Sequence, residues 1–259
     1  MTIDDLLERT QWDFFWVPAD VAIVDRAEIL YVTSPRDHFL FNQVTRTRAA
    51  AARIPALVEE VAAVHAGRRS RWLVRESIER GPLEAELARA GYAAKQECFA
   101  CALAVADHRP RPAPGITVLP VDSRARLLDC IAVANRAFAE PRPVEEEDLR
   151  RQLAECASPG ARVHRFVAYD EATGAAIASG GLTLFPALRF GFLWAGATVP
   201  EARGRGAYSA VLAARVRRAA ERGIDRVGLY AIPATSAPVV LRQGFSRHGT
   251  MTYWDRPAC

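Results

Sequence analysis

A glycine-rich junction between an apolar segment and an amphipathic segment constrains this chain more than any other feature. Residues 190–197 (FGFLWAGA) are short and apolar, as in a buried strand. After residues 198–208 (TVPEARGRGAY), apolar residues recur at helical spacing from Tyr208 onward. Gly204 and Gly206 therefore lie where a strand leads into a helix, and glycine lets the backbone adopt positive φ and approach a ligand closely. Because a helix N-terminus attracts anions, the junction predicts an anion cradle, most often one for phosphate.

The same residues resemble a known family. Residues 203–207 (RGRGA) are similar to the Arg/Gln-x-x-Gly-x-Gly/Ala loop of the GNAT acyltransferase superfamily, although the last motif position is Tyr208 instead of Gly or Ala. The resemblance implies that the loop amides bind the pyrophosphate of acetyl-CoA and that backbone groups of the preceding strand hold its pantetheine arm. A glycine turn without a ligand is the alternative. The cofactor-binding residues expected from the resemblance are Ala197, Thr198, Val199, Arg203, Gly204, Arg205, Gly206, Ala207 and Tyr208.

Strands and helices interleave along the chain, which predicts an α/β (α+β) fold. Each half ends with a helix closed by glycine, a strand, a second helix closed by Gly-Tyr or Gly-Phe, and a last strand. The closing glycines are Gly67 and Gly91 in the first half and Gly223 and Gly244 in the second. Such a repeat suggests two related units. Together with the family resemblance, it implies two GNAT-like halves, each a mixed central sheet flanked by helices.

Three prolines and a glycine within residues 108–115 predict a linker between the halves. We therefore expect a first domain at 1–107 and a catalytic GNAT domain at 116–259. The first domain is expected to be degenerate, because residues 46–53 before its first repeat helix contain no glycine. Close-set aromatic residues at 12–16 are expected at a core or an interface.

Composition narrows the function classes. The formal charge of +4 suits a polyanionic cofactor and does not demand nucleic acid. No apolar run is long enough to span a bilayer, and the start shows no signal-peptide pattern, so we expect a cytoplasmic protein without a membrane partner. Five scattered cysteines argue against a disulfide framework. Cys98 and Cys101 lie on a predicted strand and are expected to pack in the core, with no metal bound. RNA binding through a single Arg-Gly repeat is a weak alternative.

Proton transfer is the least determined part of the chemistry. Residues 172–200 contain no Asp, Glu or His, so a general base must come from Glu140, residues 145–148 or His164, all of which also fit structural roles. Two residues common in the family, a Tyr five positions before Phe245 and an Asn seven positions earlier, are Val240 and Pro233 here. The remaining hydroxyls in suitable segments belong to Tyr208, Tyr230, Tyr253 and Ser236. Our candidate catalytic residues are Tyr208, Ser236 and Glu145.

Three arginines on the helix after the loop, Arg215, Arg218 and Arg222, are expected to form a solvated basic face; contact with the 3′-phosphate of CoA is the alternative. The resemblance implies an acyl-CoA-dependent N-acyltransferase that moves acetyl from acetyl-CoA to an amine of a small molecule or a protein. The alternative is a non-catalytic acyl-CoA-binding or regulatory module, suggested by the two missing family residues.

Overall fold

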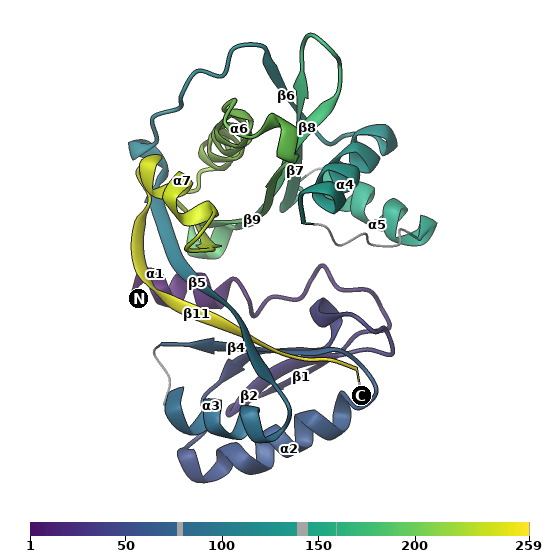
Figure 1. The fold of residues 1–259 in the computed structure, drawn as a ribbon, viewed down its shortest axis with the longest axis vertical. Coiled ribbons are helices and arrows are strands. Elements are labelled where there is room, and N and C mark those ends of the chain that lie inside the picture. The colour runs from purple at the N-terminus through teal and green to yellow at the C-terminus, as the bar shows by residue number, and fades with distance from the viewer. Residues whose placement is uncertain (77–79, 139–144, 159, 259) are drawn as a thin grey trace. The chain divides into compact units, whose positions relative to one another are not determined.

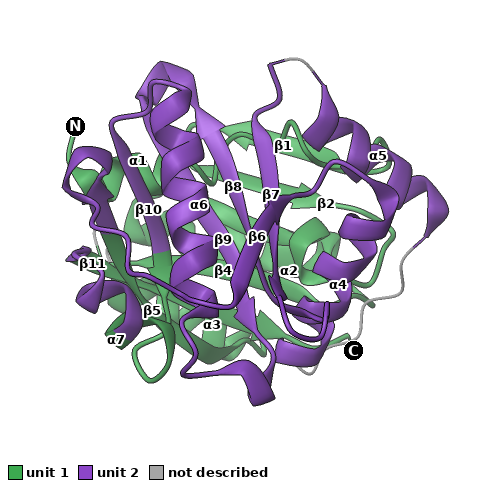
Figure 2. Cartoon of the chain, turned by 90° about the horizontal axis from the view of Figure 1, so that it is seen from above, with its two compact units in different colours: residues 1–101, 230–238, 247–259 green, residues 102–229, 239–246 purple. Residues whose placement is uncertain are grey.

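The structure, a computed structural model, describes residues 1–259 except 77–79, 139–144, 159 and 259. Its contacts divide the chain into two compact units, residues 1–101, 230–238 and 247–259, and residues 102–229 and 239–246 (Figure 2). The elements labelled in Figure 1 are, in chain order, α1 Ile3–Arg9, β1 Ala22–Arg26, β2 Ile29–Thr33, β3 Gln43–Thr47, α2 Ile54–Val64, β4 Ser70–Arg75, α3 Arg80–Arg89, β5 Ala93–Ala104, β6 Ile116–Pro120, α4 Arg124–Phe138, α5 Glu146–Ala157, β7 Val163–Asp170, β8 Ala176–Phe185, β9 Phe190–Thr198, α6 Ala207–Glu221, β10 Arg226–Ala231, α7 Ser236–Arg242 and β11 Ser246–Arg256.

The first unit is a mixed sheet in the strand order β1-β2-β3-β4-β11-β5. The β1–β2, β2–β3 and β4–β11 pairs are antiparallel, whereas β3 and β4 are parallel. Apolar residues of α2 and α3 pack with Trp72 and Tyr92 in one core cluster. The aromatic residues near the N-terminus pack as expected: Phe14 is buried against Leu30 and Val32, with Trp12 and Trp16 partly buried beside them.

The second unit is a mixed sheet in the order β10-β9-β8-β7-β6. The β6–β7, β7–β8 and β8–β9 pairs are antiparallel, whereas β9 and β10 are parallel. Neighbouring residues of a strand face opposite sides of the sheet. In β8, Gly180 faces Arg215 of α6, while Ser179 on the other face donates a hydrogen bond to the Cys130 carbonyl of α4 at 3.3 Å. Helices α6 and α4 therefore cover opposite faces.

The sequence repeat is confirmed as a structural repeat. The series β3-α2-β4-α3-β5 and β9-α6-β10-α7-β11 each contain a parallel strand pair joined by a crossover helix. The glycines that close these helices, Gly67, Gly91, Gly223 and Gly244, all have φ between +69° and +93°. Glycine is required there because this left-handed conformation is costly for other residues.

The compact units do not follow the linear domain boundary expected from the sequence. Strand β11 pairs with β4 over Met251–Arg256 and so belongs with the first unit, although it is the last strand of the chain. Residues 108–115 lie inside the second unit instead of dividing the two. Phe39–Phe41 form a short 3₁₀ turn before β3 begins at Gln43, and the His38 side chain caps this turn by accepting a hydrogen bond from the Leu40 amide.

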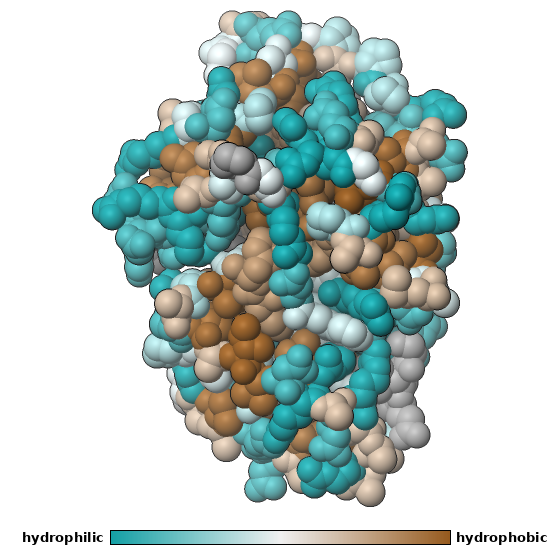
Figure 3. Space-filling view, turned by 180° about the vertical axis from the view of Figure 1, so that it is seen from behind, coloured by the Kyte–Doolittle hydropathy of each residue, from teal (hydrophilic) through white to brown (hydrophobic). Residues whose placement is uncertain are grey.

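Exposed large apolar side chains are dispersed over the sequence: Met1, Phe15, Ile23, Phe138 and Leu241. On the face drawn in Figure 3, hydrophilic and apolar residues are interspersed. Scattered apolar side chains of this kind are normal on a folded protein. Among the described residues, no helix is both long and apolar enough to cross a membrane.

Candidate active site

The glycine-rich loop joins β9 to α6 and leaves its amides open. Gly204 and Gly206 have φ of +79° and +88°, and Gly206 is the N-cap of α6. The backbone amides of residues 204–209 donate no hydrogen bond of ordinary geometry to any described residue. No heavy atom lies within 4 Å of a Cβ built on Gly204, so the backbone there borders open space. Unpaired amides at a helix N-terminus form an anion-binding site.

An ion pair anchors this loop to the sheet. Arg205 binds Asp170 at the end of β7, and Asp170 also accepts the amides of Ala172 and Thr173 at 3.0 and 3.1 Å. The Arg205 guanidinium and these amides lower the pKa of Asp170. The Arg203 side chain is exposed and forms no ion pair with the described part of the chain. Arg205 thus positions the loop, whereas Arg203 remains available to an anion.

Strands β9 and β10 separate next to the loop. Their parallel ladder covers only Phe190–Phe192 and Arg226–Gly228, although β9 continues to Thr198. The Val199 amide donates to the Ile177 carbonyl at 3.0 Å, and the Val199 carbonyl accepts from Ala202, so both backbone groups of Val199 already have partners. Backbone groups alternate in direction along a strand. Thr198 therefore presents its backbone to the open edge and is a better candidate for binding an extended ligand than Val199.

A β-bulge interrupts β9 beside this open edge. Ala195 has φ of +46°, and Ala195 and Gly196 together lie opposite the single residue Gly180, because the register shifts between Ser179 and Gly181. Bulges re-aim the local backbone and are frequent next to active sites.

Tyr208 packs against the bulge, as its place on the apolar stripe suggested. A Cβ built on Gly196 would lie 2.8 Å from Cε2 of Tyr208 and 3.3 Å from its hydroxyl. Tyr208 replaces the small residue usual in the family loop, and the missing Cβ at position 196 gives its ring room. The ring turns inward, so the Tyr208 amide stays free at the start of α6.

The opposite face of the sheet carries an indole and a cation near the bulge. The Trp194 ring covers Gly181, where a Cβ would lie 2.3 Å from the ring, and its Nε1 donates to Thr183 at 3.0 Å. The Arg165 guanidinium stacks on this indole with Cζ 4.6 Å from the ring centroid. Arg165, Gly181 and Trp194 are in register across β7, β8 and β9.

The other candidate catalytic residues differ in their surroundings. The Ser236 hydroxyl accepts the Ile232 amide at 2.8 Å, which is a structural role at the start of α7. Glu145 is exposed and forms the N-cap position of α5 without a side-chain cap. Burial lowers the pKa of His164 to about 4, so this residue is neutral at physiological pH. Glu140 lies outside the described residues.

The two CxxC thiols are buried, as expected for core residues. Burial raises the pKa of Cys98 to about 12 and that of Cys101 to about 11, which makes both thiols unreactive at neutral pH.

The matching loop of the first repeat, before α2, lacks these features. No residue from 46 to 53 has positive φ, and α2 begins after Arg53 with no side-chain cap. The Arg48 amide already donates to the Glu28 carbonyl at 2.7 Å. The Trp72 indole, at 0 % exposure, donates to Thr47 Oγ1 at 2.9 Å beside the parallel pair. A cradle of open amides is therefore found in the second unit.

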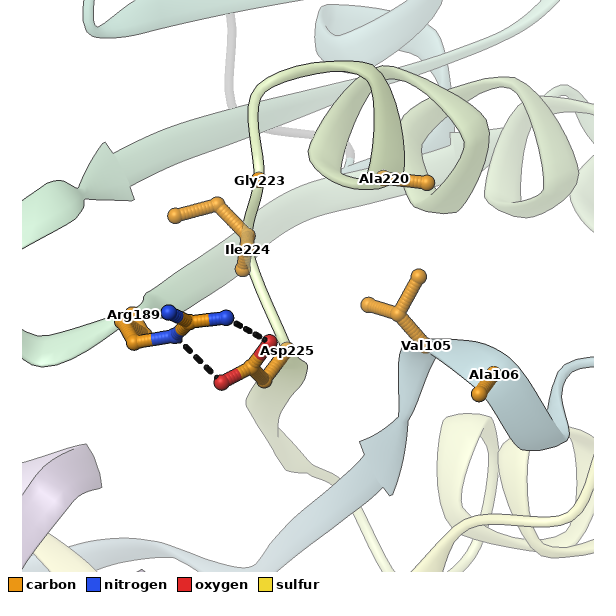
Figure 4. Close-up of a pocket in the computed structure, with 7 residues that line it drawn as sticks. All are labelled: Val105, Ala106, Arg189, Ala220, Gly223, Ile224 and Asp225. Carbon is orange, nitrogen blue, oxygen red and sulfur yellow. Dashed lines mark hydrogen bonds and ion pairs between the residues drawn. The ribbon is translucent and has the colours of Figure 1, made fainter.

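A shallow pocket of about 440 Å³ lies at the far end of α6 from the loop (Figure 4). Val105, Ala220 and Ile224 supply apolar walls, while Arg189 and Asp225 neutralise each other through bonds of 2.5 and 2.6 Å. Because it borders the C-terminus of α6, this pocket is separate from the glycine-rich loop.

Residues 127–245 match the model of the Acetyltransferase (GNAT) family. The second half of the chain is a GNAT domain. The match runs from α4 through the loop to Phe245 and includes the bulge and the open edge. No curated protein sequence matches the chain significantly.

Solved structures extend the same fold over the whole chain. A GCN5-related N-acetyltransferase from Kribbella flavida has 16% identity and a TM-score of 0.69, and covers 100% of this chain and 96% of its own. One from Sphaerobacter thermophilus has 18% identity and a TM-score of 0.61, covering 91% and 84%. A tandem GNAT protein from the clavulanic acid biosynthesis pathway has 14% identity and a TM-score of 0.62, covering 98% and 88%. These likenesses support a tandem arrangement of two GNAT-like halves.

Proposed function

We propose that this protein is an acyl-CoA-dependent N-acyltransferase that transfers acetyl from acetyl-CoA to an amine of a small molecule or a protein. The observation that carries the proposal is that the amides of residues 204–209, at the start of α6, donate no hydrogen bond to the described residues and adjoin the part of β9 beyond its ladder with β10. Membership of the second half in the GNAT acetyltransferase family supports the same reading.

The residues fit the donor. The loop amides and the N-terminal end of α6 suit a pyrophosphate, and the exposed Arg203 adds positive charge. Thr198, with its backbone directed to the open edge of β9, suits the amide groups of a pantetheine arm. Holding the thioester at the bulge would place its carbonyl near a backbone turned out of the regular ladder.

The proton transfers in this reaction do not require a dedicated acid or base side chain. The amine nitrogen attacks the thioester carbonyl carbon, the C–N bond forms, and the C–S bond breaks with CoA leaving as the thiolate. The proton released by the attacking nitrogen passes to water or to the thiolate. Orientation of the two reactants can supply much of the acceleration, which is consistent with the absence of Asp, Glu and His from residues 172–200.

Release of free thiol from acetyl-CoA in the presence of an amine panel tests this proposal. We expect release that depends on both the amine and the enzyme, and a rise in thermal midpoint when acetyl-CoA is added. Stabilisation by acetyl-CoA without thiol release for any small amine or protein lysine would favour the non-catalytic binding module. Absence of both effects would contradict the proposed site.

A further inference from the structure

Arg215 in the middle of α6 is buried far more completely than its sequence context suggested. Its exposure is 1 %, and it is among the largest fully buried side chains. The other arginines of the expected basic face are different, since Arg218 pairs with Glu221 at 3.2 Å and Arg222 is exposed. The solvated-face interpretation is thus wrong for Arg215.

The buried guanidinium has few partners. Nη1 donates to the Gly181 carbonyl at 3.3 Å, and Nε donates to the Val211 carbonyl of its own helix at 3.4 Å. Nη2 has no hydrogen-bond partner, and no carboxylate within the described residues forms an ion pair with Arg215. Burial lowers the pKa of Arg215, opposed by the neighbouring Tyr208 phenol. A buried cation without a counter-ion is costly, so its presence needs an explanation.

The guanidinium lies directly behind the β9 bulge. A Cβ on Gly180 would be 2.9 Å from Cζ of Arg215, and a Cβ on Gly196 would be 3.4 Å from Nη2. The Tyr208 ring borders the same position, with Cζ of Arg215 at 5.9 Å from its centroid. Two glycines in adjacent strands therefore make the space that brings a fixed positive charge against the bulge.

We propose that Arg215 is a buried electrostatic residue that stabilises the negative charge formed at the bulge during acyl transfer. The inference rests on the proposed function, in which the thioester oxygen becomes an oxyanion when the amine adds and CoA then leaves as a thiolate. Arg215 acts across the backbone of Gly196 and not by contact with substrate, so it is a positioning residue. A fixed charge in a dry site needs no reorganisation when the reaction begins, and such preorganised charges have large effects on rate.

This role separates activity from stability. Methionine fills the space of an arginine stem without the charge, so Arg215→Met removes a buried, uncompensated cation. We expect the variant to keep or raise the thermal midpoint, to bind acetyl-CoA within about threefold of the parent, and to lower kcat by about 10²- to 10³-fold, as loss of an oxyanion-stabilising group does. Arg215→Lys keeps a charge and should retain more activity than Arg215→Met. Arg217→Met, at an exposed position of the same helix, is the matched control and should change neither kcat nor the thermal midpoint.

The experiment measures kcat, the amine KM, acetyl-CoA affinity by calorimetry and the thermal midpoint for the parent and these three variants. A lower thermal midpoint in Arg215→Met, with activity reduced only in proportion to the folded fraction, would show that Arg215 only holds α6 on the sheet. Unchanged kcat in Arg215→Met, with an active parent, would overturn the inference alone. A parent that binds acetyl-CoA but transfers no acetyl group would overturn the proposed function and this inference with it.

Discussion

Replacing Gly206 offers the sharpest test of the proposed pyrophosphate site at the glycine-rich loop. Two substitutions there distinguish the effect of backbone strain from the effect of an added negative charge. Gly206 has φ of +88°, and a Cβ there would meet Ala113 Cβ at 3.4 Å, an ordinary contact. Gly206→Ala therefore introduces mainly left-handed strain of about 1–2 kcal/mol. For a chain of this size, that corresponds to a fall in thermal midpoint of about 2–8 °C.

Gly206→Glu adds a carboxylate at the position where we place the pyrophosphate. Two like charges about 4 Å apart repel by about 1 kcal/mol in water and about 4 kcal/mol at a partly shielded surface. We thus expect acetyl-CoA affinity to fall by about 5-fold to about 10³-fold, beyond any effect of Gly206→Ala. The loss should shrink with added salt, since screening weakens exposed charges.

Gly223 provides the matched control at the other end of α6. It has φ of +69° with no heavy atom within 4 Å of a built Cβ, so Gly223→Ala and Gly223→Glu impose similar strain and charge away from the loop. Isothermal titration calorimetry at one ionic strength compares the four variants with the parent. If Gly206→Glu bound acetyl-CoA within twofold of Gly223→Glu, the assignment of this loop would be refuted.

Three further outcomes follow from the structure. Gly181→Ala should destabilise the fold by about 1–3 kcal/mol through overpacking, because its Cβ would lie 2.3 Å from the Trp194 ring. Urea unfolding followed by tryptophan fluorescence measures this change, and an unchanged urea midpoint would contradict the packing of Trp194 on Gly181. Burial lowers the pKa of His65 and of His164 to about 4. The free energy of unfolding should therefore fall as pH drops from about 6.5 towards 4, because the unfolded chain binds protons there that the folded chain does not. His164→Gln should reduce the slope of this free energy against pH, and a slope equal to the parent's would argue against a neutral buried His164. Tyr208→Phe, Ser236→Ala and Glu145→Gln should each lower the acyl-transfer rate modestly, within about 10²- to 10⁴-fold. The transfer rate of the parent should rise with pH towards the pKa of the amine. A limb of the pH–rate profile near pH 6 that is lost in one of these variants would reveal a dedicated base.

Local sequence patterns predicted much of the secondary structure of the second half. The helix expected from Tyr208 onward begins at Ala207, and the helix before β10 is closed by the expected Gly223, since apolar periodicity and helix-closing glycines act over short stretches of chain. The open amides after Gly204 belong to the same class of feature. A glycine turn between a strand and a helix determines them without help from distant residues.

Contacts between distant segments could not be read in this way. Nothing near Arg215 in sequence distinguishes it from Arg218, and its burial depends on Gly180 and Gly196, which lie in two other strands. The inward turn of Tyr208 likewise depends on the missing Cβ at Gly196. A signal was present, since residues 180–196 contain four glycines in two adjacent apolar strands, but only the register of β8 and β9 shows which side chains need the space.

The sequence by itself determined the strand–loop–helix junction, the repeated order of elements and the glycine conformations, because each of these is set by the φ/ψ preferences and apolar spacing of consecutive residues. The tertiary structure alone decided that β11 pairs with β4, that β9 parts from β10 after Phe192, and that a charged side chain lies buried behind the bulge. Strand pairing and burial depend on which surfaces meet in space, and residues far apart in the chain carry no local mark of their partners.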